Sequence, residues 1–196
     1  MPGVSPQAEV VAAVRAASTH GAVQPVVLID GGSGSGKTSL ARAVVELWGA
    51  QGASAWLISL DDIYPGWDGP EAAGRHIVDH VLAPRAAGAP AAWQRWDWIA
   101  DAPAEWHTVP PGIPLVIEGC GALSESARSL ASLGVWVELD AATRRTRAIA
   151  RDGDLFAPHW DRWAAQEERF GRREHPRDRA DLCLDGLRVE SRSMVG

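Results

Sequence analysis

A glycine-rich stretch with an apolar run on one side and an amphipathic segment on the other constrains this chain most. Its sequence, GGSGSGKT over residues 31–38, fits the pattern G-x-x-x-x-G-K-[ST]. The apolar run 25–30 predicts a buried strand, and the apolar residues of 38–48 recur at helical spacing. Glycines let successive backbone N–H groups point inward, and the following helix adds its positive N-terminal end. The stretch therefore predicts a loop that binds phosphate, since a flexible Gly/Ser linker would explain neither flank.

Two side chains of this loop are expected to bind different parts of a Mg²⁺–nucleotide complex. Lys37, the single lysine among 19 basic residues, would reach the β- and γ-phosphates, and the Thr38 hydroxyl would bind Mg²⁺. No N-K-x-D guanine signature occurs, so ATP is expected rather than GTP. The residues expected to hold the nucleotide are Gly32, Ser33, Gly34, Ser35, Gly36, Lys37, Thr38 and Ser39.

The bulk composition limits the remaining choices. A length of 196 residues suits one α/β domain with its own core and is short for two. A net charge of −6 argues against a general nucleic-acid binder. Cys120 and Cys183 lie far apart and lack metal-ligand spacing, which indicates small buried residues in a reducing compartment. We find no signal peptide and no membrane-spanning run, and we expect a cytoplasmic protein without a membrane partner.

Apolar runs alternate with helical patterns along the chain. Strands are predicted over 25–30, 53–60, 114–119, 134–139 and 180–184, and helices over 5–18, 38–48, 71–87 (ending near Pro84), 124–133, 141–151 and 158–173. This alternation predicts one α/β domain over 1–196 with a parallel sheet and right-handed crossovers. Segment 91–111 stays unassigned, because prolines interrupt it and most of its apolar residues are tryptophans.

Acidic residues follow three of the predicted strands. Ligands bind at the carboxyl ends of parallel strands, so Asp30, Asp61 or Asp62, and Glu118 should converge on one crevice. We favour Asp61 over Asp62 as the base, because alternate residues of an extended segment face opposite ways. Thr38, Glu118 and Asp61 are the candidate Mg²⁺ ligands. A solvated Asp-Asp turn and a structural ion pair at Glu118 remain the alternatives.

Positive charge is concentrated late in the chain. Arg144, Arg147 and Arg151 share one face of a predicted helix, and the segment that follows, roughly 152–160, would form a mobile lid. Arginines at the base of a lid can stabilise a phosphoryl group in transfer. The candidate catalytic residues are Lys37, Asp61, Arg147 and Arg151. The alternative is a solvated basic face paired with Glu167 and Glu168.

Eight of the ten tryptophans fall into two groups. Trp48, Trp56 and Trp136 lie within regular elements and indicate core positions. A second group surrounds the unassigned middle segment and would suit the wall of a small-molecule pocket or, alternatively, plain core packing. Its members are Trp67, Trp93, Trp96, Trp98 and Trp106.

Taken together, these segments resemble the uridine kinase/phosphoribulokinase family of P-loop kinases. The motifs that carry the resemblance are GGSGSGKT at 31–38, DDIY at 61–64, RWDW at 95–98, VIEG at 116–119, VELDAATRRTRAIARD at 137–152 and RADLCLDG at 179–186. The resemblance implies a three-layer P-loop NTPase fold, with a five-stranded parallel sheet, helices on both faces and a small lid. It also implies an acceptor-activating Asp61, a substrate contact at Tyr64, a magnesium-site Glu118, and lid arginines at 147 and 151. The family's D-H-P-x-x-F-D and Y-D-F-x-x-H substrate segments have no close match here.

The leading functional hypothesis is an ATP- and Mg²⁺-dependent kinase that phosphorylates a hydroxyl of a small, nucleoside-like metabolite. A nucleoside-monophosphate kinase and a nucleotide-binding regulatory switch are the alternatives, and assembly as a homodimer is left open. A sugar-like alcohol or another aromatic acceptor would also suit the tryptophan-rich segment. The residues expected to bind the acceptor are Tyr64, Trp67, Asp68, Arg95, Asp97 and Trp98.

Overall fold

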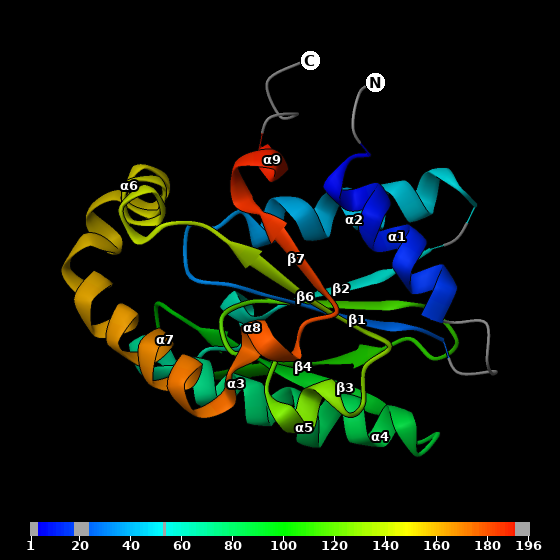
Figure 1. Cartoon of the computed structure of the whole chain (residues 1–196). Coiled ribbons are helices and arrows are strands. Elements are labelled where there is room, and N and C mark those ends of the chain that lie inside the picture. Colours follow the sequence, from blue (N-terminus) through cyan, green and yellow to red (C-terminus); the bar gives the residue numbers. More distant parts are fainter. Residues whose placement is uncertain (1–3, 18–23, 53, 191–196) are drawn as a thin grey trace.

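A five-stranded parallel sheet forms the centre of the computed structural model, which describes residues 4–17, 24–52 and 54–190. The strand order is β2-β5-β1-β6-β7 (Figure 1), and every neighbouring pair is parallel. The strands are β1 (Val26–Asp30), β2 (Trp56–Ser59), β5 (Leu115–Glu118), β6 (Leu133–Glu138) and β7 (Leu182–Asp185). The predicted α/β fold with a five-stranded parallel sheet is confirmed. The predicted boundaries at Ser18 and Ala53 lie outside the described residues.

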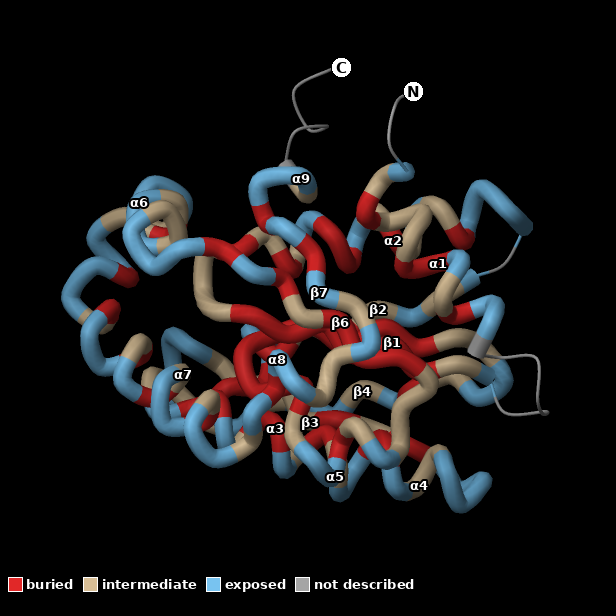
Figure 2. Tube along the Cα trace, viewed as in Figure 1, coloured by how far each residue is buried: buried red, intermediate tan, exposed pale blue. Residues whose placement is uncertain are grey.

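Two apolar layers cover the sheet, because successive side chains of a strand point to opposite faces. Val27 and Ile29 of β1 join the cluster formed with α1 (Pro6–Ala17) and α2 (Lys37–Ala50). Val26 and Leu28 join the opposite cluster, on the side of α3 (Pro70–Ile77). The sheet is therefore buried between the two layers, as the central strands in Figure 2 show.

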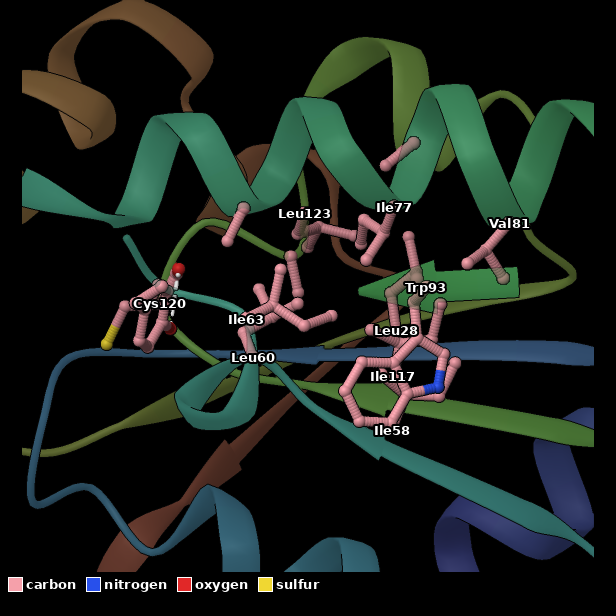
Figure 3. Close-up of a cluster of buried hydrophobic side chains, with 14 of the residues drawn as sticks. Leu28, Ile58, Leu60, Ile63, Ile77, Val81, Trp93, Ile117, Cys120 and Leu123 are labelled. Atoms are coloured by element: carbon pink, nitrogen blue, oxygen red, sulfur yellow. Dashed lines mark hydrogen bonds between the residues drawn. The ribbon is translucent and has the colours of Figure 1, made fainter. Parts of the chain in front are cut away.

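The second layer contains a long helical segment and a hairpin. Helix α3 continues through a π-helical turn (Val78–Leu82) into α4 (Ala83–Ala86), and so runs past Pro84. Its inward residues Ile77 and Val81 face the strands in Figure 3. Pro84 has no N–H to donate, and the preceding π turn accommodates this loss within the helix. The helix predicted over 124–133 is shorter, since α5 spans only Glu125–Arg128.

The unassigned segment 91–111 contains an antiparallel hairpin of β3 (Ala91–Asp97) and β4 (Ala102–Val109). Trp93 is 7% exposed and packs into the core cluster on the side of α3, whereas Trp98 and Trp106 are exposed. The Asp97 carboxylate accepts hydrogen bonds of 3.0 Å from the backbone N–H groups of Ile99 and Ala100. Asp97 therefore stabilises the turn of the hairpin.

In the C-terminal third of the described chain, three helices lie between β6 and β7, and a fourth follows the end of β7. They are α6 (Ala141–Asp152), α7 (Trp160–Glu174), α8 (Pro176–Arg179) and α9 (Gly186–Glu190). Helix α6 begins where the Asp140 carboxylate accepts a 2.9 Å hydrogen bond from the Thr143 N–H. Two short 3₁₀ turns, 153–155 and 157–159, connect α6 to α7 where the lid is predicted. Within the described ranges no helix is both long and apolar enough to cross a bilayer.

One strand end differs from the prediction in a way that affects the site. β2 ends at Ser59, and Leu60–Asp62 forms a 3₁₀ turn rather than an extended segment. The expectation that Asp61 and Asp62 alternate like strand residues is therefore wrong. Their orientations are set by the turn and by its neighbours.

Candidate active site

The glycine-rich loop joins the end of β1 to the start of α2. Gly34 and Gly36 have φ values of +80° and +100°, which non-glycine residues rarely adopt. A Cβ atom on Gly34 would also lie 2.2 Å from the carbonyl oxygen of Arg144, so a side chain would not fit there. Helix α2 begins at Lys37 without a side-chain cap, and its first N–H groups remain available to an anion. The loop has the geometry of a phosphate cradle.

Lys37 is 7% exposed and lies across the base of this loop. Its Nζ donates to the Gly32 carbonyl oxygen at 3.1 Å and lies 3.4 Å from the Cys120 Sγ. Burial disfavours its charge, but the Cys120 sulfur and nearby carboxylates, including Glu118, raise its pKa overall. Lys37 is thus held as a cation beside the cradle.

A buried carboxylate adjoins the start of α2. Glu118, at the end of β5, is 1% exposed, and its Oε1 accepts hydrogen bonds from Thr38 Oγ1 at 3.1 Å and Ser59 Oγ at 2.7 Å. Burial raises the Glu118 pKa, Lys37 lowers it, and the charge of Asp61 raises it further. Thr38 and Glu118, two of the three predicted Mg²⁺ ligands, are therefore in direct contact. The charge of the third, Asp61, acts on the pKa of Glu118.

The donor set suits Mg²⁺. This ion prefers oxygen ligands and in kinase sites takes one or two carboxylates together with phosphate oxygens and water. Within the described chain, no cluster of three or more His, Cys, Asp or Glu side chains has metal-binding spacing. Thr38 and Glu118 would hold the ion at the cradle, with the phosphates completing its ligands.

Asp61 and Asp62 face different neighbours. The charge of Asp61 acts on Glu118 and Arg151, whereas Arg95 and His107 of the hairpin act on Asp62. Partial burial and the Asp61 charge raise the Asp62 pKa. The Asp61 carboxylate is therefore within electrostatic range of groups beside the phosphate loop, and the Asp62 carboxylate within range of groups of the hairpin.

The predicted lid arginines lie beside the phosphate loop. Arg147 and Arg151 of α6 border a cavity of about 250 Å³, and the rest of its wall comes from Gly34, Gly36, Lys37, Thr38, Ser39 and Ala148. Arg147 donates to the Gly186 carbonyl oxygen at 3.4 Å, and Arg151 pairs with Asp152 through two hydrogen bonds of 2.7 and 2.8 Å. Both arginines therefore border the cavity beside the phosphate loop.

Trp67 is the centre of an aromatic cluster next to the lid. Its ring stacks on His159 at 4.3 Å and on Phe156 at 5.4 Å, and it meets Trp98 edge-on at 5.1 Å. Asp68 pairs with Arg162 of α7, with one hydrogen bond of 2.9 Å. Three predicted acceptor residues, Trp67, Asp68 and Trp98, therefore lie together next to the lid segment.

Three other predicted acceptor contacts have structural partners. The Tyr64 side chain is 1% exposed and its hydroxyl donates to the Cys120 carbonyl oxygen at 2.9 Å, so Tyr64 contacts the loop after β5, and a substrate contact at Tyr64 stays a prediction. Arg95 forms hydrogen bonds of 2.7 and 3.1 Å to Glu105 across the hairpin. Asp97 caps the hairpin turn, as described above. A role for Arg95 or Asp97 in acceptor binding stays a prediction.

Two carboxylates organise the loops around the site in ways that the sequence does not predict. Asp30 is 2% exposed and accepts backbone hydrogen bonds from Gly31 at 2.6 Å, Leu123 at 2.8 Å and Gly121 at 3.3 Å. Burial raises its pKa to about 6. Asp30, which the sequence places at the crevice as the end of a buried strand, thus fixes the loop after β1 to the loop after β5. Glu167 of α7 is predicted from the sequence only as a partner for surface arginines, but in the structure it contacts the phosphate loop at Ser33.

Comparison with known proteins finds a related kinase. A uridine kinase from Deinococcus deserti is 32% identical over 148 residues, which cover 67% of this chain and 70% of that protein. No family model matches the chain.

Solved structures show the same fold at lower identity. A protein described as a possible uridine kinase from Bacillus stearothermophilus aligns with a TM-score of 0.64 and 18% identity, over 90% of this chain and 100% of its own. A candidate fructose transport system kinase from Silicibacter sp. TM1040 aligns with a TM-score of 0.59 and 17% identity, over 93% of this chain and all of its own. These likenesses confirm the three-layer P-loop fold, and with the closer relative they place the chain in a family. It belongs to the uridine kinase/phosphoribulokinase-like P-loop kinases and is an ATP-dependent kinase.

Proposed function

We propose that the protein transfers the γ-phosphate of ATP to a hydroxyl of a nucleoside-like small molecule, with Asp61 as the base. The observation that carries the proposal is the placement of Asp61. It follows β2 at the carboxyl edge of the sheet, and its charge acts on both Glu118 and Arg151, which adjoin the phosphate loop from two sides. A carboxylate there can orient an acceptor hydroxyl and take its proton as the phosphoryl group is transferred.

In this proposal the other charged residues bind the phosphates, stabilise the transferred group or hold Mg²⁺. Lys37 and Arg147 bind the phosphates from the loop and from α6, and Arg151 stabilises charge on the moving group. Thr38 and Glu118 would hold Mg²⁺, which when bound would neutralise phosphate charge. The 3.1 Å hydrogen bond between Thr38 and Glu118 keeps both groups together at the cradle.

The aromatic cluster supports a nucleoside-like acceptor. Trp67 and Trp98 contact each other at 5.1 Å, and Trp98 donates to the backbone of Asp61, so their rings lie beside the proposed base. Flat aromatic rings can stack on a nucleobase and fix the attached sugar. The relative from Deinococcus deserti is a uridine kinase, which favours the same class of acceptor.

The proposal is tested by measuring phosphoryl transfer from labelled ATP to a panel of nucleosides, nucleoside monophosphates and sugars. We expect a nucleoside to be the best acceptor, and D61N to lower kcat by about 10²- to 10⁴-fold, the usual contribution of a general base. D62N is the matched control, because it makes the same change one residue along and should leave kcat within about threefold of wild type. Equal losses in D61N and D62N would contradict the assignment of the base. A sugar as the best acceptor would contradict the substrate class.

A further inference from the structure

One carboxylate from α7 contacts the phosphate loop directly. The Glu167 Oε1 accepts a 2.7 Å hydrogen bond from the backbone N–H of Ser33. The same oxygen accepts from Trp163 Nε1 at 2.9 Å and lies 3.3 Å from the Cys120 Sγ. The Glu167 side chain is 12% exposed, so these contacts are largely shielded from water.

The second oxygen of Glu167 connects the loop to the lid-base helix. Glu167 Oε2 accepts from the Arg144 guanidinium at 3.0 Å, and the same guanidinium nitrogen donates to the Ser33 carbonyl oxygen at 3.2 Å. Ser33 is thus held at its N–H by Glu167 and at its C=O by Arg144. Hydrogen bonds to charged groups are stronger than those between neutral groups, so this arrangement fixes one peptide segment of the loop firmly.

Glu167 acts from the side of the loop away from the phosphate cavity. The cavity beside Lys37 is bordered by Gly34, Arg147 and Arg151, and Glu167 is not part of its wall. Glu167 instead borders a separate cavity of about 250 Å³, together with Gly31, Gly32 and Arg144. It therefore supports the loop from behind and does not occupy the place of a phosphate.

We propose that Glu167 is a positioning residue for ATP, which sets the conformation of the phosphate loop through Ser33 and Arg144. The proposal rests on ATP binding at that loop. Helix α7 directly follows the proposed lid, and Trp163, which also bonds Glu167, packs edge-on against Trp67 and Tyr64. Glu167 thereby connects the segment that covers the site with the loop that binds the nucleotide.

The test compares the affinity of the purified full-length protein for Mg·ATP, by calorimetry, with the KM and kcat of phosphoryl transfer. E167A removes both acceptor oxygens, and E167Q keeps the oxygen that accepts from Ser33 but loses the charge that pairs with Arg144. E168Q is the matched control, because Glu168 pairs with the exposed Arg172 and has no contact to the loop among the described interactions.

We expect E167A to weaken Mg·ATP binding about tenfold, E167Q to weaken it about threefold, and E168Q to leave it unchanged. The KM for ATP should rise in parallel, while the KM for the acceptor stays constant. A purely structural role would lower the melting temperature and kcat without this selective change in ATP affinity. If E167A does not fold, the Mg·ATP affinity of E167Q is compared with that of wild type and of E168Q.

Two results would overturn the proposal. Unchanged ATP affinity in folded E167A or E167Q would show that the loop keeps its conformation without Glu167. Tighter ATP binding would show that Glu167 competes with phosphate. A wild-type protein that binds ATP but phosphorylates no acceptor would contradict the proposed function alone, because the affinity comparison needs no turnover.

Discussion

The indole Nε1 of Trp98 donates a 2.9 Å hydrogen bond to the backbone carbonyl oxygen of Asp61. Trp98 directly follows β3, and Asp61 lies in the turn that follows β2, so the bond joins the hairpin to the proposed catalytic turn. Trp98 also meets Trp67 at 5.1 Å, which connects the same hairpin to the aromatic cluster by the lid. One side chain therefore contacts both the aromatic cluster and the backbone of the proposed base.

Replacing Trp98 with phenylalanine should slow catalysis without weakening nucleotide binding. W98F keeps an aromatic ring near Trp67 but removes the donor that holds Asp61. One lost hydrogen bond of about 1 kcal/mol corresponds to a fall in kcat of about fivefold. Steady-state kinetics, with Mg·ATP affinity measured in parallel, would check this. W106F is the control, since Trp106 is exposed on β4 and contacts His76 and His80 rather than Asp61. A loss of the same size in W106F would point to a general effect on the hairpin.

The buried Asp30 predicts a specific dependence of stability on pH. Burial raises its pKa from 3.8 to about 6, so the folded state favours the protonated carboxyl. Stabilisation from this group is then fully present below about pH 4 and is lost as the pH rises through 6. A shift of about two pKa units corresponds to about 3 kcal/mol.

The comparison of wild type with D30N isolates this contribution. D30N destabilises the fold at every pH, because its amide cannot accept the three backbone hydrogen bonds that Asp30 accepts. The free energy of unfolding of wild type relative to D30N should nevertheless increase by about 2 to 3 kcal/mol from pH 7 to pH 4. Denaturant unfolding of both proteins across this range gives the difference. A difference that is constant with pH would place the Asp30 pKa near its ordinary value.

The sheet and the phosphate loop could be predicted from the sequence because local patterns encode them. Buried parallel strands appear as continuous apolar runs, and the loop carries its own glycine, lysine and threonine signature. Asp30 and Glu118 were identified because each ends such a strand, where side chains must converge. Arg147 and Arg151 followed from helical spacing.

The contacts that are long-range in sequence could not be predicted in this way. Glu167 lies 134 residues from Ser33, and nothing in its local pattern distinguishes it from the exposed Glu168. The β3–β4 hairpin was missed because its tryptophans and prolines obscure the two-residue alternation of a strand. Tyr64 was assigned by resemblance alone, and its burial arises from α7 and the β5 loop packing around it.

The two cysteines should differ strongly in reactivity. Burial raises the pKa of the Cys120 thiol to about 12, whereas Cys183 is exposed. Thiol reagents attack the thiolate, so iodoacetamide at pH 7.5 should modify Cys183 and leave Cys120 intact. Mass spectrometry of digested peptides would locate the label, and unfolding in guanidinium should make both cysteines reactive. Rapid labelling of Cys120 in the native protein would show that the space behind the phosphate loop opens to solvent.

Glu118 provides the most direct test of the proposed Mg²⁺ site. E118Q keeps an oxygen that can accept from Thr38 and Ser59, so the local fold should persist, but the negative charge is lost. Because Mg²⁺ binds protein carboxylates in preference to amides at such sites, the Mg²⁺ concentration for half-maximal activity should rise about tenfold or more. Titration of Mg²⁺ at saturating ATP would measure this.

Ser59 offers the control for this change. S59A removes the 2.7 Å hydrogen bond that orients Glu118 but leaves the carboxylate in place. We expect its Mg²⁺ requirement to rise by only a few-fold, because a lost orienting contact of about 1 kcal/mol corresponds to about fivefold. Similar Mg²⁺ dependence in wild type and E118Q would mean that Thr38 and the phosphates hold the ion without Glu118. The buried carboxylate would then serve chiefly to balance the charge of Lys37, whose pKa it raises.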